Sequence, residues 1–424
     1  MYKKTVLDNG LRIVTYQMPK RLTVSLGVWI GTGGRYENQQ NKGAAHFLEH
    51  LIFKGSKKYS NRAIKESIEG VGGSLNGFTS EELTCYLAKV PSRYLNLSLS
   101  ILSDVVLNPL LKIQDLEKER PVIMEEIRMY KDLPQHIVVE ALDEIMWPDH
   151  PLGMSIAGTL ESIGKMTNNQ ISGFKNNYYL ASNIVIAACG ALEHNKLVSL
   201  SKKIFTDKTS PKKDFSFQKV SIAQDEPKIK LVNKDIEQTH LAIGLHGLKR
   251  DHKDSHALGL LNVILGANMS SRLFHEVREK RGLAYAISSY VKRYYDTGAF
   301  VVHAGTDNLK FIETIEVILN ELKKIKNPRV KITELNRAKE YYIGQLTMAL
   351  EETLEHMVWI GESTMSLNKI YTFDQVLKEV KKIKTDDLLR VANTLFRNDR
   401  INLALVGPTA EKAKEKIQDL FNLD

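Results

Sequence analysis

Hydrophobic and polar positions along the chain follow two periods, which predict strands in some segments and amphipathic helices in others. An Asn-Gly pair within residues 7–11 signals a turn between two strands, and residues 23–30 form a more apolar strand. Further strand-like segments cover residues 74–78, 84–88 and 183–189. Helical spacing of apolar residues covers residues 43–53, 61–69, 93–105, 116–130, 138–146 and 168–178.

The second half of the chain repeats the order of elements found in the first half. Residues 241–247 resemble residues 25–31 in pattern, and in each half a helix, a second helix and a pair of strands follow. A polar stretch that contains a proline separates the two halves. We therefore predict two related domains, residues 1–206 and residues 228–424, joined by a linker at residues 207–227.

The order of the predicted elements also indicates the fold class. Runs of consecutive helices stand beside pairs of strands, whereas a doubly wound parallel sheet requires strict alternation of strands and helices. The pattern therefore favours α+β domains, in which helices cover one face of a largely antiparallel sheet.

The composition is typical of an ordinary globular protein, with 43% hydrophobic and 26% charged residues. No apolar run approaches the ~20 residues that a membrane-spanning helix needs, so we expect no membrane partner. The chain carries no apparent targeting segment, so we expect it to be cytoplasmic or already processed. Its two cysteines, Cys85 and Cys189, lie in apolar strand-like segments, and a disulfide framework is not expected.

The net charge of +9 raises the hypothesis of a nucleic-acid-binding module. The lysines, however, are spread over helical faces and are not interleaved with aromatic residues, which favours a solvated surface. We therefore expect no nucleic-acid partner. The alternative predicts steeply salt-dependent binding to oligonucleotides and no enzymatic activity.

The segment HFLEH at residues 46–50 holds the candidate chemistry of the chain. On a helix, His46 and His50 project from the same face, so that both imidazoles can bind one metal ion. Glu49 shares this face and can reach a water molecule on the ion. The alternative is that both histidines are core residues with ordinary hydrogen-bond partners.

A catalytic zinc ion needs a third protein ligand and one open coordination position. The helical segment at residues 116–130 is the best donor, because Glu119 and Glu126 lie about two helical turns apart on one face. From the residues alone, both glutamates are candidates.

The segment HFLEHLIFKG, which begins at His46, resembles the signature of the inverzincin peptidases. This family comprises pitrilysin, insulin-degrading enzyme, the mitochondrial processing peptidases and their short bacterial relatives. The resemblance implies that His46 and His50 hold one Zn²⁺ per chain and that Glu126, at the end of the segment ERPVIMEE, is the third ligand. It also implies that Glu49 is the general base and that Glu119 is an accessory catalytic residue, which orients a histidine ligand or the base.

Two further segments of the first half carry the resemblance. The segment HPLG at residues 150–153 matches a family segment, and residues 73–80 resemble a strand whose edge binds the substrate backbone. The resemblance therefore implies that Asn76, Gly77 and Phe78 are substrate-binding residues. Gly77 replaces the alanine that is usual in the family, which slightly loosens the edge.

The second half lacks a copy of HFLEH but carries the segment REKRGLAY, which begins at Arg278 and ends at Tyr285. The resemblance implies that Arg278 and Tyr285 bind the scissile carbonyl group and stabilise the tetrahedral intermediate. The alternative is a salt bridge at a helix end beside a tyrosine of the core.

The resemblance as a whole implies a zinc-dependent metalloendopeptidase that hydrolyses peptides or short unfolded polypeptides. The short family members are half as long as the clam-like members, so we expect a dimer around a chamber, either a homodimer or a heterodimer with a paralogue. In such a dimer, Arg278 and Tyr285 would act on the partner's metal site. The alternative is a non-catalytic partner or scaffold subunit, although such chains typically lose the metal motif that is intact in this sequence.

Overall fold

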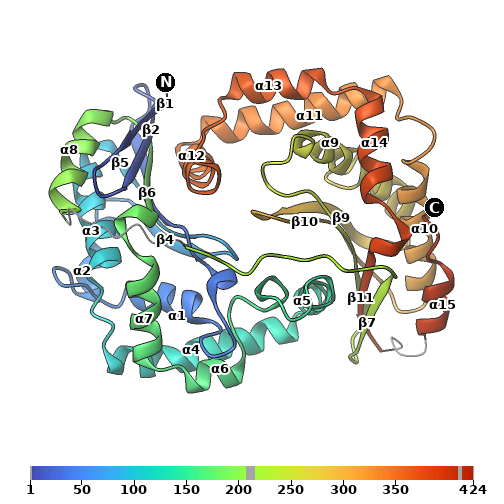
Figure 1. Ribbon diagram of the computed structural model, residues 1–424, viewed down its shortest axis with the longest axis horizontal. Helices are drawn as coiled ribbons and strands as arrows, with labels where there is room; N and C mark the ends of the chain where they lie inside the picture. Colours follow the sequence, from blue (N-terminus) through green and yellow to red (C-terminus); the bar gives the residue numbers. More distant parts are fainter. Residues whose placement is uncertain (1, 207–214, 409–412, 424) are drawn as a thin grey trace. The chain divides into compact units, whose positions relative to one another are not determined.

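The described chain forms two compact units, and each is built around one mixed sheet. The computed structural model describes residues 2–206, 215–408 and 413–423 (Figure 1). The first unit comprises described residues of Met1–Arg128, Ser155–Gln218 and Thr347–Tyr371. The second unit comprises described residues of Met129–Met154, Lys219–Leu346 and Thr372–Asp424.

The first sheet places a polar strand at its edge and apolar strands at its centre. Its strand order is β1 (Tyr2–Val6), β2 (Arg12–Gln17), β6 (Ile184–Gly190), β3 (Thr23–Ile30), β5 (Thr84–Pro91) and β4 (Ser74–Thr79). All neighbouring pairs are antiparallel except β2 and β6. β3 and β6 are buried along nearly their whole length, whereas β4 alternates between exposed and half-buried residues. The alternation of β4 suits an edge strand, which keeps one face toward solvent.

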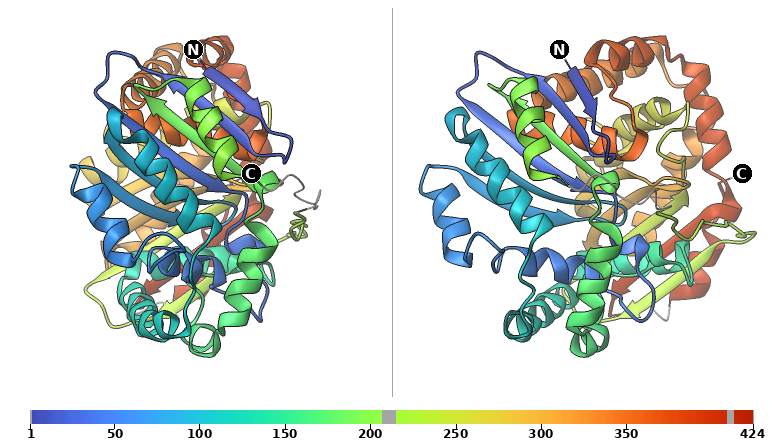
Figure 2. Two further views of the ribbon diagram at one scale, coloured as in Figure 1. Left: turned by 90° about the vertical axis from the view of Figure 1, so that its left-hand side faces the viewer. Right: turned by 60° about the vertical axis from the view of Figure 1, so that its left-hand side comes forward.

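Helices cover both faces of the first sheet. One face packs on the helices of the N-terminal half, and the view of Figure 2 (left) has α3 and α8 lying in front of the strands. The opposite face, which includes Trp29 and Cys85, packs on the apolar side of α12. The helices of this unit are α1 (Ala44–Ile52), α2 (Asn61–Glu69), α3 (Leu95–Leu107), α4 (Ile113–Asp132), α6 (Leu160–Lys165), α7 (Asn168–Tyr178), α8 (His194–Ile204) and α12 (Thr353–Leu367).

The second sheet has a similar design. Its strand order is β7 (Lys228–Asn233), β11 (Ile401–Gly407), β8 (Gln238–His246), β10 (Gly298–Asp307) and β9 (Ala284–Arg293), and only β7 and β11 are parallel. One face packs on α5 (Pro134–Met146). The other helices of this unit are α9 (Ser255–Leu265), α10 (Phe311–Lys324), α13 (Phe373–Lys382), α14 (Thr385–Leu395) and α15 (Lys414–Asp419), together with the π-helical segment η5 (Phe274–Glu279).

The remaining elements are one long helix and several short 3₁₀ turns. α11 (Ile332–Glu351) begins in the second unit and ends in the first. The 3₁₀ turns are η1 (Gly34–Tyr36), η2 (Ser92–Tyr94), η3 (Pro151–Gly153), η4 (Ala181–Asn183) and η6 (Asn398–Arg400). Among the described residues, none of the helices combines the length and the apolar character that crossing a membrane would require.

The predicted α+β class, with largely antiparallel sheets covered by helices, is confirmed, but neither unit is continuous in sequence. α5 comes from the first half and packs on β8 and β11 of the second unit, while α12 comes from the second half and packs on β2, β3 and β6 of the first. Each helix buries an apolar side on a sheet face that would otherwise be open to water. The predicted domains, 1–206 and 228–424, therefore differ from the compact units at these two helices. Of the predicted linker, residues 207–214 lie outside the described residues.

Candidate metal centre

The helix that carries the two histidines is positioned by its apolar side. Ala44, Phe47 and Leu48 are buried, as are the other apolar residues of α1, so its polar residues share the remaining side. The N-cap residue of this helix is Gly43, whose φ of 89° lies in the left-handed region that favours glycine. A Cβ atom there would lie 2.9 Å from the carbonyl oxygen of Ala157. Glycine is therefore also required because the backbone at Ala157 packs closely against this position.

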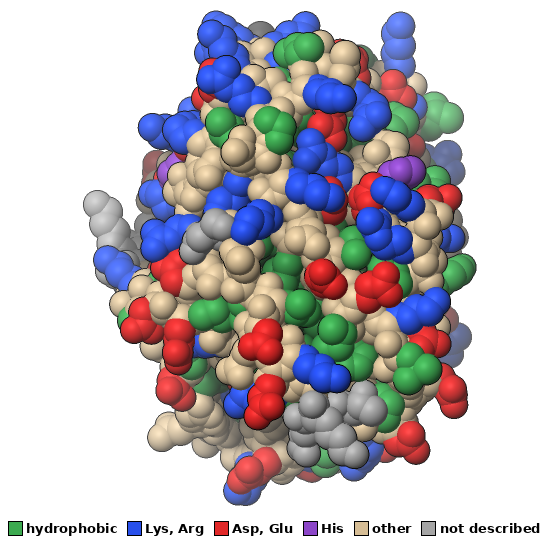
Figure 3. Space-filling model, turned by 90° about the vertical axis from the view of Figure 1, so that its right-hand side faces the viewer, with side chains coloured by type: hydrophobic (Ala, Val, Ile, Leu, Met, Phe, Trp, Pro, Cys, Tyr) green, Lys and Arg blue, Asp and Glu red, His purple; other side chains and the backbone are tan. Residues whose placement is uncertain are grey.

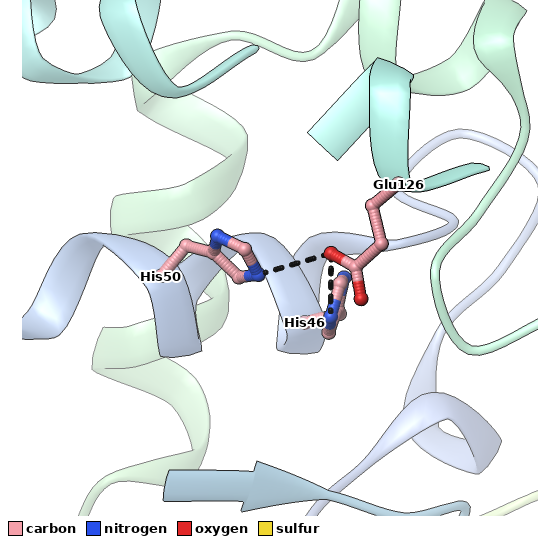
Figure 4. Close-up of side chains that lie close together, drawn as sticks. All are labelled: His46, His50 and Glu126. Atoms are coloured by element: carbon pink, nitrogen blue, oxygen red, sulfur yellow. Dashed lines mark ion pairs between the residues drawn. The ribbon is translucent and has the colours of Figure 1, made fainter. Parts of the chain in front are cut away.

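Three side chains from two helices converge beside α1. His46 and His50 come from α1 and Glu126 comes from α4, and Figure 4 shows all three pointing toward one another. The Oε2 atom of Glu126 lies 3.8 Å from Nε2 of His46 and 3.4 Å from Nε2 of His50. One ligand atom from each of these residues lies within 4.8 Å of the others. The structure therefore brings together the three residues that the resemblance names as ligands.

The spacing of these atoms suits a bound metal ion better than direct hydrogen bonds. An imidazole N–H donates to a carboxylate oxygen over ~2.7–3.2 Å, which is shorter than either separation. A tetrahedral zinc ion with bonds of ~2.0–2.2 Å holds its ligand atoms roughly 3.3–3.6 Å apart. Two imidazoles and one carboxylate are also the ligand set of several catalytic zinc sites, in which the fourth position holds water. The residues present therefore fit Zn²⁺.

Glu119 orients His50 from the side opposite the candidate metal. Its Oε1 atom lies 3.1 Å from Nδ1 of His50, and its Oε2 atom forms an ion pair with Lys54. Burial would raise the pKa of Glu119, but the hydrogen bonds from His50 and Lys54 hold that pKa below its usual value. The ionised carboxylate can thus accept the Nδ1–H of His50 and leave Nε2 free to bind the ion. Lys54 had no predicted role, although it lies within the motif segment.

The two histidines differ in their affinity for protons when no metal is bound. Burial, together with the neighbouring His50, lowers the pKa of His46 to about 4. Burial also lowers the pKa of His50, but Glu119 and Glu126 outweigh it and raise this pKa to about 9. His46 is therefore neutral at pH 7 and ready to bind a metal, whereas binding at His50 must displace a proton.

Glu49 lies on the same helix and is held by a residue of the edge strand. The Oγ1 hydroxyl of Thr79, at the end of β4, donates a hydrogen bond of 2.6 Å to Oε2 of Glu49. Burial raises the pKa of Glu49 above its usual value, and the bond from Thr79 opposes this rise. Thr79 stands in the strand segment that the resemblance singles out, but no feature of the sequence indicated that it would meet Glu49.

The predicted substrate strand passes directly over Glu49. A Cβ atom on Gly77 would lie 3.3 Å from Cγ of Glu49, so the backbone of β4 and the candidate base are in close contact. β4 pairs with β5 on one side and, among the described residues, with no strand on the other. Phe78 is partly exposed and packs edge-on against Trp29, with ring centroids 5.6 Å apart, while Asn76 accepts a hydrogen bond from the backbone N–H of Gly77.

Arg278 and Tyr285 belong to the second unit and contact each other. Arg278 lies in η5 and Tyr285 in β9, and Cζ of the arginine is 4.9 Å from the centroid of the tyrosine ring. Tyr285 is 76% exposed, so it is not the core tyrosine of the alternative interpretation. The pair is therefore available to a molecule that binds at this surface.

The chain is similar to known proteins in both sequence and structure. A family model described as Insulinase (Peptidase family M16) matches residues 12–160, and one described as Peptidase M16 inactive domain matches residues 165–342. An uncharacterized zinc protease of Bacillus subtilis is 35% identical over 96% of this chain and 99% of its own length. Another, of Streptomyces coelicolor, is 33% identical over 98% of this chain and 92% of its own length.

Solved structures with the same fold cover almost the whole chain. A protease from Helicobacter pylori matches with a TM-score of 0.91 and 26% identity, over 96% of this chain and 99% of that one. A peptidase M16 inactive domain from Pseudomonas fluorescens matches with a TM-score of 0.89 and 19% identity, over 96% of this chain and 98% of that one. The second match shows the fold alone.

Proposed function

Because the chain belongs to the insulinase family of peptidases (Peptidase family M16), we propose that it is a zinc-dependent metalloendopeptidase. The membership confirms the resemblance that the sequence indicated, and the relatives are named zinc proteases. The observation that carries the proposal is the convergence of His46, His50 and Glu126 beside Glu49. We propose peptides or short unfolded polypeptides as substrates.

The proposed metal site holds one Zn²⁺ per chain through His46, His50 and Glu126. When bound, zinc acts as a Lewis acid and lowers the pKa of water from ~15.7 to ~7. Glu119 accepts the Nδ1–H of His50, which keeps the Nε2 lone pair directed at the metal position.

Glu49 is the proposed carrier of the proton. It removes a proton from the attacking water, whose oxygen bonds to the peptide carbonyl carbon, and it gives that proton to the amine nitrogen when the C–N bond breaks. Burial raises the pKa of Glu49 above its usual value, which helps the side chain both to accept and to release the proton near neutral pH.

The edge of β4 is the proposed binding site of the substrate backbone. Asn76, Gly77 and Phe78 would hold an extended peptide mainly through main-chain hydrogen bonds, so cleavage should depend on the length and flexibility of the substrate more than on its sequence. Arg278 and Tyr285 would bind the carbonyl oxygen, where their cationic and phenolic donors stabilise the developing negative charge. Their mutual contact and the exposure of Tyr285 support this role.

The substitution Glu49→Gln tests the proposed function. It keeps the size of the side chain and leaves the three metal ligands in place, so zinc content per chain should stay unchanged while kcat falls by at least ~10². Cleavage is measured on a quenched peptide and on a peptide mixture with mass mapping of the products, with and without a chelator. If the variant keeps its rate within a factor of a few, Glu49 is not the base.

The alternative is a non-catalytic partner or scaffold subunit. The family model that matches residues 165–342 is described as an inactive domain, and the relatives are uncharacterized, so the names alone do not decide between the two functions. The alternative would be favoured if the chain binds zinc but leaves every peptide of the mixture intact, although relatives of the chain cleave peptides of the same mixture.

We propose a dimer as the working form, and a homodimer suffices because one chain carries both the metal residues and the Arg278 and Tyr285 pair. Mixing inactive Glu49→Gln protein with inactive Tyr285→Phe protein should then restore part of the activity through mixed dimers. If subunit exchange is verified and no activity is recovered, then Tyr285 acts within its own chain or the protein is monomeric. A heterodimer with a paralogue then becomes the next proposal to test.

We also propose that the chain binds no nucleic acid and is cytoplasmic. On the face shown in Figure 3, Lys and Arg side chains gather in the upper half and Asp and Glu side chains in the lower half. Basic residues of the second unit such as Lys382, Arg390 and Arg329 form ion pairs with acidic neighbours, which supports a solvated surface. The burial of Cys85 and Cys189 as free thiols supports a reducing compartment.

A further inference from the structure

A buried carboxylate lies at the N-terminus of the helix that carries His46 and His50. Glu37, directly after η1, is only 7% exposed. Its Oε2 atom accepts a hydrogen bond of 2.8 Å from the backbone N–H of Gly43, and its Oε1 atom accepts one of 2.7 Å from that of Ala45. Both amides belong to the first turn of α1.

This turn has no capping side chain of its own. The first N–H groups of a helix have no partner within the helix, and a side chain at the N-cap position usually accepts from one of them. The N-cap residue here is Gly43, which has no side chain, and a Cβ atom at that position would lie 2.8 Å from the Ile163 side chain and 2.9 Å from the Ala157 carbonyl. Because the packing excludes a larger residue, the cap has to come from elsewhere, and Glu37 supplies it.

Retaining a carboxylate in such a place is energetically costly unless its bonds are made. Burial raises the pKa of Glu37 to about 8, and the amides of Ala45 and Gly43 oppose this rise because they favour the ionised form. A negative charge at a helix N-terminus also interacts favourably with the helix dipole. The first turn of α1 is thus held by two hydrogen bonds to a side chain that is itself immobilised by burial.

Glu37 is connected through η1 to the turn between β4 and β5. The backbone N–H of Arg35 donates to the carbonyl of Glu81 at 2.7 Å, and Nη1 of Arg35 donates to Oε1 of Glu82 at 2.6 Å. Both partners lie in the turn that follows the proposed substrate strand β4, and Arg35 and Glu82 are fully buried. One short segment therefore joins the substrate strand to the start of the metal helix.

We propose that Glu37 is a positioning residue, which fixes the first turn of α1 relative to β4 and thereby directs His46 and Glu49 at the metal position. This inference rests on the proposed function. Glu37 bonds to Ala45, the residue before His46, and so acts through the backbone of the helix. A catalytic site loses ~10² in rate when a group is misplaced by about 1 Å, so a loosened first turn should weaken both metal binding and turnover.

The test compares Glu37→Ala and Glu37→Gln with a matched control, Ser60→Ala. Ser60 is the N-cap residue of α2, a helix of the same length in the same unit, and its hydroxyl accepts from the backbone N–H of Ala63. All three substitutions weaken a helix cap, and each should lower the urea midpoint of unfolding. Only the Glu37 variants loosen the helix that carries the metal residues.

The main measurement is zinc affinity, obtained by competition between metal-free protein and a chromophoric chelator. Glu37→Ala should bind zinc ~10–100-fold more weakly than the wild type, the range seen for residues that orient metal ligands. Glu37→Gln keeps one acceptor oxygen and should weaken binding less, and Ser60→Ala should leave the affinity unchanged. In the cleavage assay, kcat should fall in the same order while KM changes little.

The proposal would be overturned if Glu37→Ala binds zinc within twofold of the wild-type affinity while it loses as much stability as Ser60→Ala does. If Glu37→Ala does not fold, as judged by circular dichroism, the affinity of Glu37→Gln decides in the same way. The affinity comparison does not depend on peptide cleavage. A wild-type chain that binds zinc but cleaves nothing would therefore refute the proposed function and leave the role of Glu37 to be decided by the affinities.

Discussion

The hydrogen bond from Thr79 to Glu49 allows a specific prediction for catalysis. Thr79→Val removes the hydroxyl that donates to Glu49 at 2.6 Å and nearly preserves the shape of the side chain. A hydrogen bond to a charged group contributes ~1.5–3 kcal/mol, and one pKa unit corresponds to ~1.4 kcal/mol. Because the bond favours the ionised form of Glu49, its removal should raise the pKa of Glu49.

The raised pKa has a defined consequence for the pH dependence of the reaction. As the proposed base, Glu49 acts only when it is ionised, so the acidic limb of the kcat/KM profile should move to higher pH. Below this limb, the variant should be ~10–100-fold slower than the wild type, and above it the two rates should approach each other. Thr79→Ser keeps a donor at the same position and should leave the limb close to that of the wild type.

The assay is cleavage of a quenched peptide between about pH 5 and about pH 9, with zinc content measured for every sample. Zinc content separates an effect on the base from a loss of metal at low pH. The reasoning is refuted if the profile of Thr79→Val superimposes on that of the wild type. It is also refuted if Thr79→Ser moves the limb as far as Thr79→Val does, because a shared shift would point to packing and not to the hydrogen bond.

Four further substitutions test other parts of the structure. Glu126→Ala should abolish stoichiometric zinc binding together with cleavage, because two imidazoles alone leave the metal site incomplete, and one retained zinc per chain would contradict the assignment. Gly361→Ala should destabilise the chain by ~1–3 kcal/mol, because the new Cβ atom would lie 2.1 Å from the indole nitrogen of buried Trp29. A Cβ atom at Gly344 in α11 would meet nothing within 4 Å, so Gly344→Ala should stabilise the folded chain by up to ~1 kcal/mol. In urea unfolding, the two glycine substitutions should therefore change the free energy of unfolding in opposite directions. Burial lowers the pKa of His246 to about 4, so between that pH and its ordinary 6.5 the unfolded state binds a proton that the folded state does not. The free energy of unfolding should therefore fall by up to ~3 kcal/mol as the pH falls across this window. In the His246→Asn variant, the urea midpoint should depend less on pH over the same window.

The sequence determined the features that depend on local geometry. The spacing of His46, Glu49 and His50 places them on one side of a helix wherever that helix packs, because the helical repeat is a property of the backbone. The runs of helices and paired strands likewise indicated the α+β class, since the apolar period of each segment reflects the face that it must bury. The choice of Glu126 over Glu119 as the third ligand came from the family resemblance and not from spacing, which both residues satisfy.

Only the tertiary structure decided how distant segments meet. It placed α12 on the sheet of the first half and α5 on that of the second, because an open apolar sheet face is covered by whichever helix the chain can bring to it. It also brought Thr79 to Glu49 and Glu37 to the first turn of α1. Thr, Glu and Gly occur throughout the chain in ordinary roles. A hydrogen bond between residues that are far apart in sequence produces no periodic pattern from which it could be predicted. The candidate ligands are thus marked in the sequence, whereas the contacts of Thr79 and Glu37 emerge only from packing.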